Sequence, residues 1–493
     1  MNKQSVSRRD FLQQTSMASG AILGLSTLCP RRARAVGPFV RRDIGTLSAT
    51  DTILTSYAAA VSAMQQLDTT DPTNPLGWRY QAAIHGTNAP MTTPGEQAAW
   101  NTCQHNTEFF LSWHRMYLYY FERIIRKMSG DASWALPFWN YESAAERALP
   151  KAFWTPAADS NPLYVSDRIP SWNDGTASLW DSAVSTSIAF GDIDFGSFYS
   201  QLEYNPHDTV HVAIGGLMGV IQTSAQDPIF FLHHCNIDRL WNAWLAQKGG
   251  RQDPYNDSTW TTTAFTFFDE NKKQVSITGC DILRAQEQLG YVYEGEPPQI
   301  KKYCLHRRIR VPYYAYIPWY EIWPGPIELP AVLESRRIQV NTEPLIQHLR
   351  ITPLARIRVG SAVVLKLSQV EANHQPNVYY EVYFGPKGTF PQFESPFYVG
   401  NLALFGGGVR DMEGQMKYHE RYLPKTAEAG HLPVFTFKIS RALEAAIKVA
   451  GSLKDLEVIM VPRGALLNGR PDERRPTATI RIGRAEIGLQ SLE

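Results

Sequence analysis

Hydrophobic and polar positions follow two different periods along the chain, and the change of period divides it into two regions. From about Leu47 to Leu245, apolar residues recur at spacings of three and four, which predicts amphipathic helices. Four helices are expected, at residues 48–67, 112–128, 207–214 and 228–245. Long loops rich in Pro, Asp, Ser and Trp connect them, and loops of this length usually carry function or cover a site.

The pattern changes to strict alternation beyond a Pro-rich passage at about residues 294–330, and alternation is typical of strands. Strands are expected at 355–370, 378–384, 433–439, 456–461 and 477–487. Short alternating strands between turn residues indicate a β-sandwich. The predicted organisation is a mainly α domain at 36–300, a Pro-rich linker at 301–330 and a β-sandwich C-terminal domain at 331–493.

Length and composition add few constraints to this picture. A chain of 493 residues is long enough for two or three domains. The net charge of +1 gives no reason to expect a nucleic acid or an anionic membrane surface as a partner. Beyond the N-terminus, no stretch approaches the roughly 20 apolar residues of a membrane helix, so no membrane span is predicted.

The N-terminus has the features of an export signal. Arg8 and Arg9 lie in the motif SRRDFL, a weakly apolar stretch follows, and Ala33-Arg34-Ala35 fits a small-x-small cleavage site. We predict a twin-arginine signal peptide at residues 1–35, and therefore a periplasmic or extracellular destination. Removing it leaves four cysteines, too few for a disulfide framework, of which Cys280 and Cys304 could pair.

Histidine spacing is the strongest chemical signal in the chain, because seven of the twelve histidines lie between positions 85 and 234. His207 and His211 are four residues apart, so both rings project from one helix face and can share a metal ion. His234 follows the expected helix start at Pro228. Asp238 lies one turn beyond His234, where its carboxylate could accept a ring N–H from a histidine. Its neighbour Arg239 suggests that this region holds a polar network.

A second group consists of His85, His105 and His114. His105 and His114 are nine residues apart, which on an ideal helix places them about 900° apart, on opposite sides. They converge only if His105 precedes the helix, and Ser112 is a plausible N-cap for a helix bearing His114. His85 can supply a third ligand from elsewhere. Sites built only of imidazoles suit copper or zinc, and spacing alone does not choose between them.

Two longer motifs around these histidines resemble those of the tyrosinase and polyphenol oxidase group of type 3 copper proteins. Residues 105–115 read HNTEFFLSWHR and are similar to the first copper signature of that group. Residues 227–238 read DPIFFLHHCNID and are similar to the second. The segments 136–141 and 290–293 look like further landmarks. The resemblance covers residues 37–300 well, and the C-terminal part looks like the β-domain of long members.

The resemblance implies a four-helix bundle around a binuclear centre of two copper ions that binds dioxygen. It implies oxidation of a phenolic substrate, o-diphenols to o-quinones, with or without prior hydroxylation of monophenols. Copper A would be bound by His85, His105 and His114, and copper B by His207, His211 and His234. His233 has no ligand role in the family, so we expect it to support the site without binding metal.

Three further positions carry over from the family. Cys103 and His105 match the Cys-x-His motif of members that form a thioether between these residues. Glu203 lies four residues before His207, like the glutamate that holds a water near the second copper. Asp208 follows His207, where efficient monophenol hydroxylators often carry Asn, so this departure puts monophenol hydroxylation in doubt.

Four other functions compete with diphenol oxidation. An o-aminophenol or nitrosating-type oxidase and a reversible oxygen carrier could use the same centre. A zinc hydrolase could also use three-histidine sites. A binding module would have an inert core and a β-domain that docks a partner. A further expectation concerns the β-domain itself, which could cover the site and keep the enzyme latent until it is cleaved.

Overall fold

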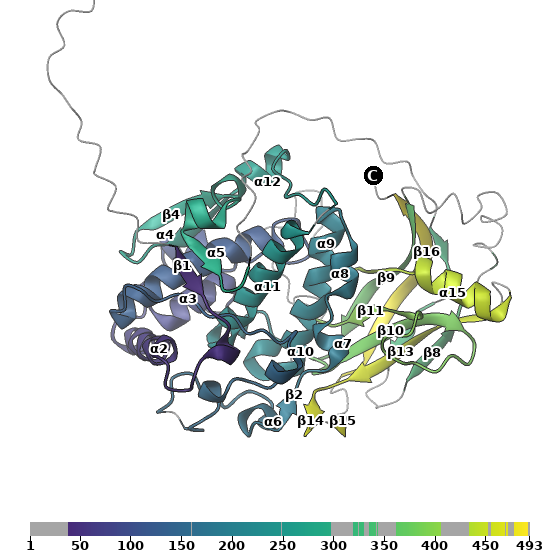
Figure 1. Cartoon of the computed structure of the whole chain (residues 1–493), viewed down its shortest axis with the longest axis horizontal. Coiled ribbons are helices and arrows are strands. Elements are labelled where there is room, and N and C mark those ends of the chain that lie inside the picture. The colour runs from purple at the N-terminus through teal and green to yellow at the C-terminus, as the bar shows by residue number, and fades with distance from the viewer. Residues whose placement is uncertain are drawn as a thin grey trace, which may run out of the picture. The chain divides into compact units, whose positions relative to one another are not determined.

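A computed structural model gives the arrangement of the chain (Figure 1). The structure describes residues 38–491, apart from the segments 159, 248, 297–318, 324, 330–334, 342, 344–360, 406–432, 452–454, 469 and 472–477. The predicted signal peptide, with Arg8 and Arg9, lies outside the described residues, as does most of the predicted linker. Helix and strand labels follow Figure 1.

Five helices form the frame of the first region and include the four that were expected. They are α2 (Thr52–Thr70), α3 (Trp78–His85), α5 (Phe110–Ser129), α10 (Thr209–Ile214) and α11 (Ile229–Ala246). The helix α5 packs against both α2 and α11 and lies between them. Its buried face carries Trp113, Met116 and Ile124 at the helical spacing that the sequence pattern predicted.

Helix starts follow local chemistry, and two of them differ from expectation. The Asp51 carboxylate accepts the Ile53 backbone N–H at 2.9 Å, so α2 begins after Asp51 rather than near Ser48. The prediction that Ser112 is the N-cap of α5 was wrong. The helix begins two residues earlier, after Phe109, and the Ser112 hydroxyl donates to the Phe109 carbonyl at 3.1 Å from inside the first turn.

Short elements fill the space between the long helices. The helices are α4 (Pro94–Ala99), α6 (Pro170–Asn173), α7 (Asp181–Val184), α8 (Ser187–Gly191), α9 (Phe195–Leu202) and α12 (Ser258–Thr262). Strand β1 (Phe39–Arg41) pairs in parallel with β5 (Tyr291–Tyr293), and β3 (Ala264–Phe268) pairs antiparallel with β4 (Gln274–Thr278). The first described residues are thereby joined to the end of the helical region.

The second region is rich in antiparallel sheet. One sheet has the order β11-β10-β13-β8 and the other β12-β9-β16-β6, with β7 also paired to β16. The five expected strands are found as β9 (Ser361–Ala372), β10 (Tyr379–Pro386), β12 (Phe435–Lys438), β13 (Leu456–Arg463) and β16 (Ile480–Ser491). The others are β6 (Tyr320–Glu321), β7 (Ile327–Leu329), β8 (Arg336–Gln339) and β11 (Tyr398–Leu402), and a helix, α15 (Ser440–Ala450), was also not expected.

Two hydrophobic cores correspond to the two regions. The first is built almost entirely from residues between Ile44 and Tyr293, and the second mainly from residues between Ile322 and Ile487. A helical region followed by a sheet-rich region is therefore confirmed. The four-helix bundle, the β-sandwich and the domain bounds 36–300, 301–330 and 331–493 stay predictions.

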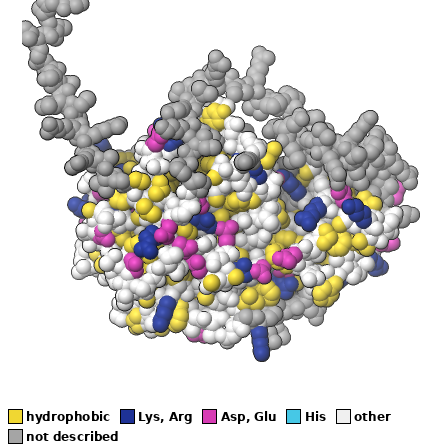
Figure 2. Space-filling view, in the orientation of Figure 1, with side chains coloured by type: hydrophobic (Ala, Val, Ile, Leu, Met, Phe, Trp, Pro, Cys, Tyr) yellow, Lys and Arg dark blue, Asp and Glu magenta, His cyan; other side chains and the backbone are white. Residues whose placement is uncertain are grey.

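Hydrogen bonds join the two regions directly. Strand β14 (Leu466–Leu467) pairs with β15 (Arg470–Pro471) and also with β2 (Ala177–Ser178) of the helical region. The face shown in Figure 2 mixes Lys and Arg with Asp and Glu side chains, and no histidine of the described part is visible on it. Among the described residues, no helix combines the length and the apolar character that crossing a membrane requires.

Candidate metal centre

The first three histidines come from three separate places in the chain. His85 is the last residue of α3, His105 lies in the loop before α5, and His114 lies in the second turn of α5. Their ring centroids are 5.3 to 5.6 Å apart. The expectation that His105 precedes the helix of His114 is confirmed, and the three rings meet as one group whose candidate donor atoms lie within 4.8 Å of one another.

Backbone carbonyls orient two of these rings. The Nδ1 atom of His114 lies 2.7 Å from the Phe110 carbonyl, and that of His85 lies 3.0 Å from the Ile221 carbonyl. Because a carbonyl oxygen only accepts, each Nδ1 carries the hydrogen and each Nε2 keeps its lone pair. Burial lowers the pKa of His114 to about 3, so its ring is neutral and suited to bind a metal.

The second group depends on a break in the backbone. Asn205, inside the segment Glu203–Asp208 that follows α9, has extended φ and ψ angles of −153° and 120°, so the helical path breaks just before His207 and the helix α10. His207 and His211 then lie 4.7 Å apart between ring centroids. The ring of His234, from α11, is 4.9 Å from that of His207 and 5.4 Å from that of His211.

The rings of this group are also oriented from outside. The Nδ1 atom of His211 lies 2.8 Å from the Met218 carbonyl, and that of His207 lies 2.8 Å from an oxygen of Asp208. The Nε2 atoms of His211 and His234 face each other at 3.3 Å. Burial, and then the neighbouring histidines, lower the pKa of all three rings well below the usual value, so they are neutral.

The two groups adjoin and fit a pair of copper ions. The rings of His114 and His234 stack with centroids 4.3 Å apart and an angle of 11° between their planes. Among the described residues, Nε2 of His114, Nε2 of His207 and Nδ1 of His234 are buried without a hydrogen-bond partner. Buried polar atoms are normally satisfied, and imidazole nitrogens suit copper or zinc, so metal ions would satisfy the Nε2 atoms.

Two buried carboxyl groups lie beside the second histidine group. One oxygen of Glu203 accepts the Asn106 backbone N–H at 2.7 Å, and its other oxygen is buried with no hydrogen-bond partner in the described part of the chain. Burial raises the pKa of Glu203 well above its usual value, and burial together with Glu203 does the same for Asp208. Glu203 therefore lies next to the backbone that carries His105, as well as near His207 in sequence.

Asp238 does not orient a histidine, contrary to expectation. Its carboxylate accepts hydrogen bonds from Arg115 at 2.5 Å, Arg41 at 3.3 Å, Tyr291 at 2.6 Å and Tyr293 at 2.5 Å. Burial opposes ionisation, but the two guanidinium groups outweigh it and lower the pKa of Asp238. A histidine was the wrong partner because Arg41 and Arg115, brought in from distant segments, give a buried carboxylate the charge that it needs.

The other expected positions are placed as follows. Arg239 forms ion pairs with Glu142 and Glu296 rather than with Asp238, so the expected polar network is present with different partners. Cys103 is buried two residues before His105 and is not in a disulfide. Cys280 is disulfide-bonded, whereas its expected partner Cys304 lies outside the described residues.

One residue near the histidines was missed by the sequence reasoning. Phe405, which follows β11, stacks on the ring of His211 with centroids 3.9 Å apart and an interplanar angle of 12°. It also contacts the rings of His105 and His207 edge-on, at 5.6 and 5.5 Å. His233 was expected to support the site without binding metal, and its candidate donor atom lies with those of His207, His211 and His234.

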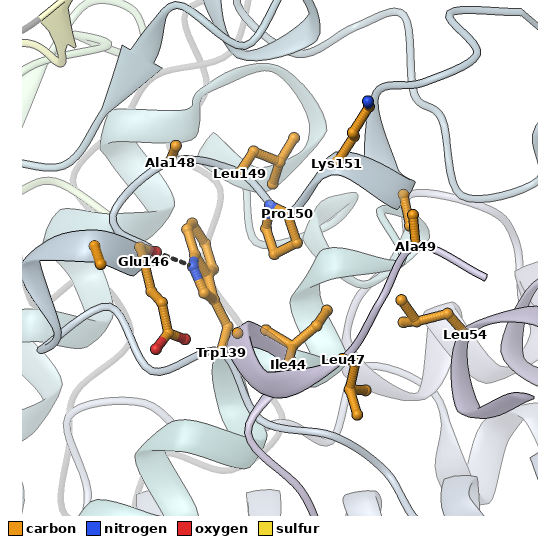
Figure 3. Close-up of a pocket in the computed structure, with 13 residues that line it drawn as sticks. Ile44, Leu47, Ala49, Leu54, Trp139, Glu146, Ala148, Leu149, Pro150 and Lys151 are labelled. Carbon is orange, nitrogen blue, oxygen red and sulfur yellow. Dashed lines mark hydrogen bonds between the residues drawn. The ribbon is translucent and has the colours of Figure 1, made fainter. Parts of the chain in front are cut away.

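A separate cavity of about 370 Å³ lies away from the histidines, and none of the six lines it (Figure 3). Its wall includes the indole of Trp139, which donates to the Glu146 backbone carbonyl at 2.6 Å, together with Ile44 and Leu149. Burial and the neighbouring carboxyl of Asp43 raise the pKa of Glu146 to about 7. The cavity has no group of metal-binding side chains among its described residues.

Comparison with known protein families matches the region that carries the histidines. The common central domain of tyrosinase matches residues 75–177 and 155–247, and the polyphenol oxidase middle domain matches residues 254–302. A tyrosinase of Hahella sp., HcTyr1, is 39% identical over 292 residues, which are 49% of this chain and 61% of that protein. The chloroplastic polyphenol oxidase B of Solanum lycopersicum is 29% identical over 292 residues, 50% and 48% of the two chains.

The chain thus spans between about half and 61% of the length of these relatives. Solved structures match over more of it. Latent apple tyrosinase has a TM-score of 0.57 and 20% identity, covering 93% of this chain and 98% of its own. Latent aurone synthase, a polyphenol oxidase, has a TM-score of 0.59 and 19% identity, covering 94% and 91%. The fold is shared over both regions, and the part of the chain that carries the histidines is similar in sequence to the central domain of tyrosinase and the middle domain of polyphenol oxidase.

Proposed function

We propose that the chain oxidises o-diphenols to o-quinones with dioxygen at two copper ions, held in a four-helix bundle that precedes a β-sandwich. The observation that carries this proposal is the pair of adjoining histidine groups with buried nitrogens that lack hydrogen-bond partners. Copper A would be bound by His85, His105 and His114, and copper B by His207, His211 and His234. When bound, the copper ions would supply the redox chemistry that moves electrons from the phenol to dioxygen.

The chain itself would prepare this chemistry in three ways. Carbonyl groups fix the tautomers of His85, His114 and His211, so that each ring presents a lone pair without rearrangement. Burial keeps the rings neutral. The same burial excludes bulk water, which strengthens the interactions of any charge that develops on a bound phenol.

Glu203 is the residue that we propose to assist the removal of the phenol proton. One of its oxygens is held by the Asn106 backbone N–H, and the other is buried without a hydrogen-bond partner among the described residues. This second oxygen can hold a water molecule that takes the proton, which is general-base catalysis. Asp208 is engaged with Nδ1 of His207 at 2.8 Å. Because Asp stands where efficient monophenol hydroxylators often carry Asn, we propose that monophenol hydroxylation is weak.

Cys103 and His105 are the proposed partners of a thioether bond. Bond formation would join the sulfur to a ring carbon and remove one hydrogen from each; the two electrons and two protons would pass to dioxygen, the oxidant of the proposed activity, with the copper ions supplying the redox chemistry. Burial of Cys103 would protect the thiol from other oxidants until then. Peptide mass spectrometry of copper-loaded protein tests this, because the crosslinked peptide is lighter by two hydrogen atoms and lacks a thiol that can be alkylated.

The sheet-rich region is proposed to hold the enzyme latent. Phe405 lies on the face of His211 and at the edges of His105 and His207, in the space that a phenol ring would need to approach copper. Removing the residues after about 330 tests this. If diphenol oxidation by the truncated, copper-loaded chain were no faster than that of the full chain, latency would be wrong.

One assay separates the competing functions. The copper-loaded protein is given a matched monophenol, o-diphenol and o-aminophenol, and metal content is measured in the same sample. We expect two copper ions per chain and lag-free oxidation of the diphenol, with little monophenol turnover. Reversible oxygen binding without turnover would indicate an oxygen carrier, preference for the o-aminophenol would indicate that class of oxidase, and zinc in place of copper would contradict the proposal. Export by the twin-arginine route to the periplasm or the exterior remains part of the proposal.

A further inference from the structure

The second histidine group contains one imidazole more than a three-ligand site needs. His233 and His234 are adjacent on α11, and both face His207 and His211. The ring of His233 is 4.8 Å from that of His211, perpendicular to it, and 5.4 Å from that of His207. The candidate donor atoms of all four residues lie within 4.8 Å of one another.

His233 is oriented in the same manner as the expected ligands. Its Nδ1 atom makes a 3.1 Å hydrogen bond with the hydroxyl of Tyr141, which lies outside the histidine group. Its Nε2 atom is buried and has no hydrogen-bond partner in the described part of the chain. His114 and His207 show the same pattern, with Nδ1 bonded outward and Nε2 buried without a partner. A histidine that only filled space would not need this arrangement.

The two neighbours on α11 differ in what they pack against. His234 stacks on His114 of the first group, so a metal bound through His234 lies beside copper A. His233 instead packs against Tyr141, with ring centroids 5.7 Å apart. The first group has no comparable extra member among the described residues, since only His85, His105 and His114 gather there.

We propose that the second copper has two alternative sets of three ligands, which share His207 and His211 and differ in whether His234 or His233 completes the set. This inference rests on the copper assignment made above. The set with His234 is the working site beside copper A. The set with His233 binds the copper ion during uptake, or when binding through His234 is disturbed, so that the ion stays in the site.

The alternative set predicts a difference between variants that can be read from copper content alone. In His234→Gln, the ligands His207, His211 and His233 remain, so we expect close to two copper ions per chain after loading and desalting. In the double variant His233→Gln/His234→Gln, only two imidazoles remain and copper should fall to one per chain. The matched control is His207→Gln/His211→Gln, which removes both shared ligands, leaves two imidazoles and should also leave one copper. One copper per chain in His234→Gln would overturn the proposal.

A second measurement does not require the removal of a working ligand. His233→Leu and His233→Met have similar side-chain volume, but only Met offers a sulfur donor, which copper(I) accepts. We expect His233→Leu to lose its second copper to a chelator about tenfold faster than the unchanged protein, and His233→Met to restore most of the retention. A purely structural role would make the two variants alike, and equal rates in all three proteins would also overturn the proposal.

These outcomes are distinct from failure of the proposed function. If the unchanged protein bound two copper ions but formed no quinone, the proposed activity would be wrong, while the copper counts of the variants would still decide between one ligand set and two.

Discussion

The two halves of the metal centre are built in different ways. The first histidine group, proposed to bind copper A and termed the copper A half, takes its rings from a helix end, a loop and a helix turn, and backbone carbonyls orient the rings of His85 and His114. The second group, proposed to bind copper B and termed the copper B half, takes its rings from α10, the turn before it and α11. Three further groups lie here. The Asp208 carboxyl group is hydrogen-bonded to His207, His233 adds a fourth imidazole, and Phe405 of the sheet-rich region stacks its phenyl ring on His211.

This difference suggests a division of labour between the halves. The copper A half offers a single set of three donors, since the rings of His85 and His114 are hydrogen-bonded to backbone carbonyls and no further donor of the described residues belongs to this group. The copper B half lies beside the groups to which we assign proposed roles: Glu203 as the proton acceptor, His233 as the alternative ligand and Phe405 as the cover of the site. Changes in the copper A half should therefore remove function, whereas changes in the copper B half should alter it.

The largest effect is expected from His114→Gln, which removes a ligand for which no substitute is nearby. Copper should fall from two ions to one, and the diphenol rate should fall by at least about a hundredfold. Metal analysis and a catechol assay measure both. His234→Gln is the matched variant in the other half, and the comparison between the halves would break if His114→Gln kept two copper ions.

Asp238→Asn should destabilise both halves, because Asp238 on α11 pairs with Arg115 on α5 and so joins the two helices. It leaves the buried Arg115 without its carboxylate and removes one of the two carboxylates that pair with Arg41, so we expect a loss of about 3–5 kcal/mol in the free energy of unfolding, measured with denaturant.

The pH dependence of this loss follows from the lowered pKa of Asp238. The stabilising contribution is present above the usual carboxyl pKa and is lost as pH falls through the folded value, so the difference from the unchanged protein should shrink in strong acid. The control is Asp181→Asn, since Asp181 is 64% exposed in its pair with Arg147 and should cost about 1 kcal/mol or less. Equal losses of unfolding free energy in the two variants would mean that the buried network stabilises the fold no more than an exposed ion pair does.

Phe405→Ala tests the cover over the copper B half. An aromatic pair contributes up to about 1.5 kcal/mol, so opening it should raise diphenol turnover by the full-length chain by up to about tenfold. Phe390→Ala is the control, because Phe390 belongs to the same region but is 81% exposed. An unchanged rate in Phe405→Ala would show that the phenyl ring does not limit access to the centre.

Asp208→Asn should have the smallest effect, and on selectivity rather than on total rate. The amide oxygen of Asn can still accept the Nδ1 hydrogen of His207, so copper binding should persist. We expect a severalfold rise in the ratio of monophenol to diphenol rates, measured on a matched pair of substrates. Strong monophenol turnover by the unchanged protein would already contradict the role assigned to Asp208.

The sequence was sufficient where local geometry decides. The four-residue spacing of His207 and His211 and the nine-residue spacing of His105 and His114 determine which rings can share a helix face, and the structure agrees. The sequence pattern also located five strands, although β10 and β13 are buried on both faces along almost their whole length. Even so, the start of α5 was misplaced at Ser112, because a helix can begin at Phe110 without a side-chain cap when its apolar face is buried.

Long-range partners could not be predicted from one sequence. Arg41 and Asp238 are 197 residues apart, and nothing in either neighbourhood indicates the other. Phe405 reaches His211 only because of how the sheet-rich region packs on the helical one. The short strand β8 was missed for a related reason, since four residues carry little pattern apart from the sheet that they complete. The helix α15 was missed although Ala442, Leu443 and Ala446 form a buried face at helical spacing.

The pairing of β2 with β14 attaches the sheet-rich region, which carries Phe405, to the helical region by backbone hydrogen bonds that do not depend on the linker. Alongside this pairing, the Asn401 amide donates to the Ser182 carbonyl at 2.8 Å, and the Tyr379 hydroxyl lies 2.8 Å from the Ser182 hydroxyl. A single cut between the regions would therefore leave a nicked but intact complex. Activation would then be governed by dissociation, so that a cleaved sample should gain activity on dilution and lose it again when the two fragments are concentrated together.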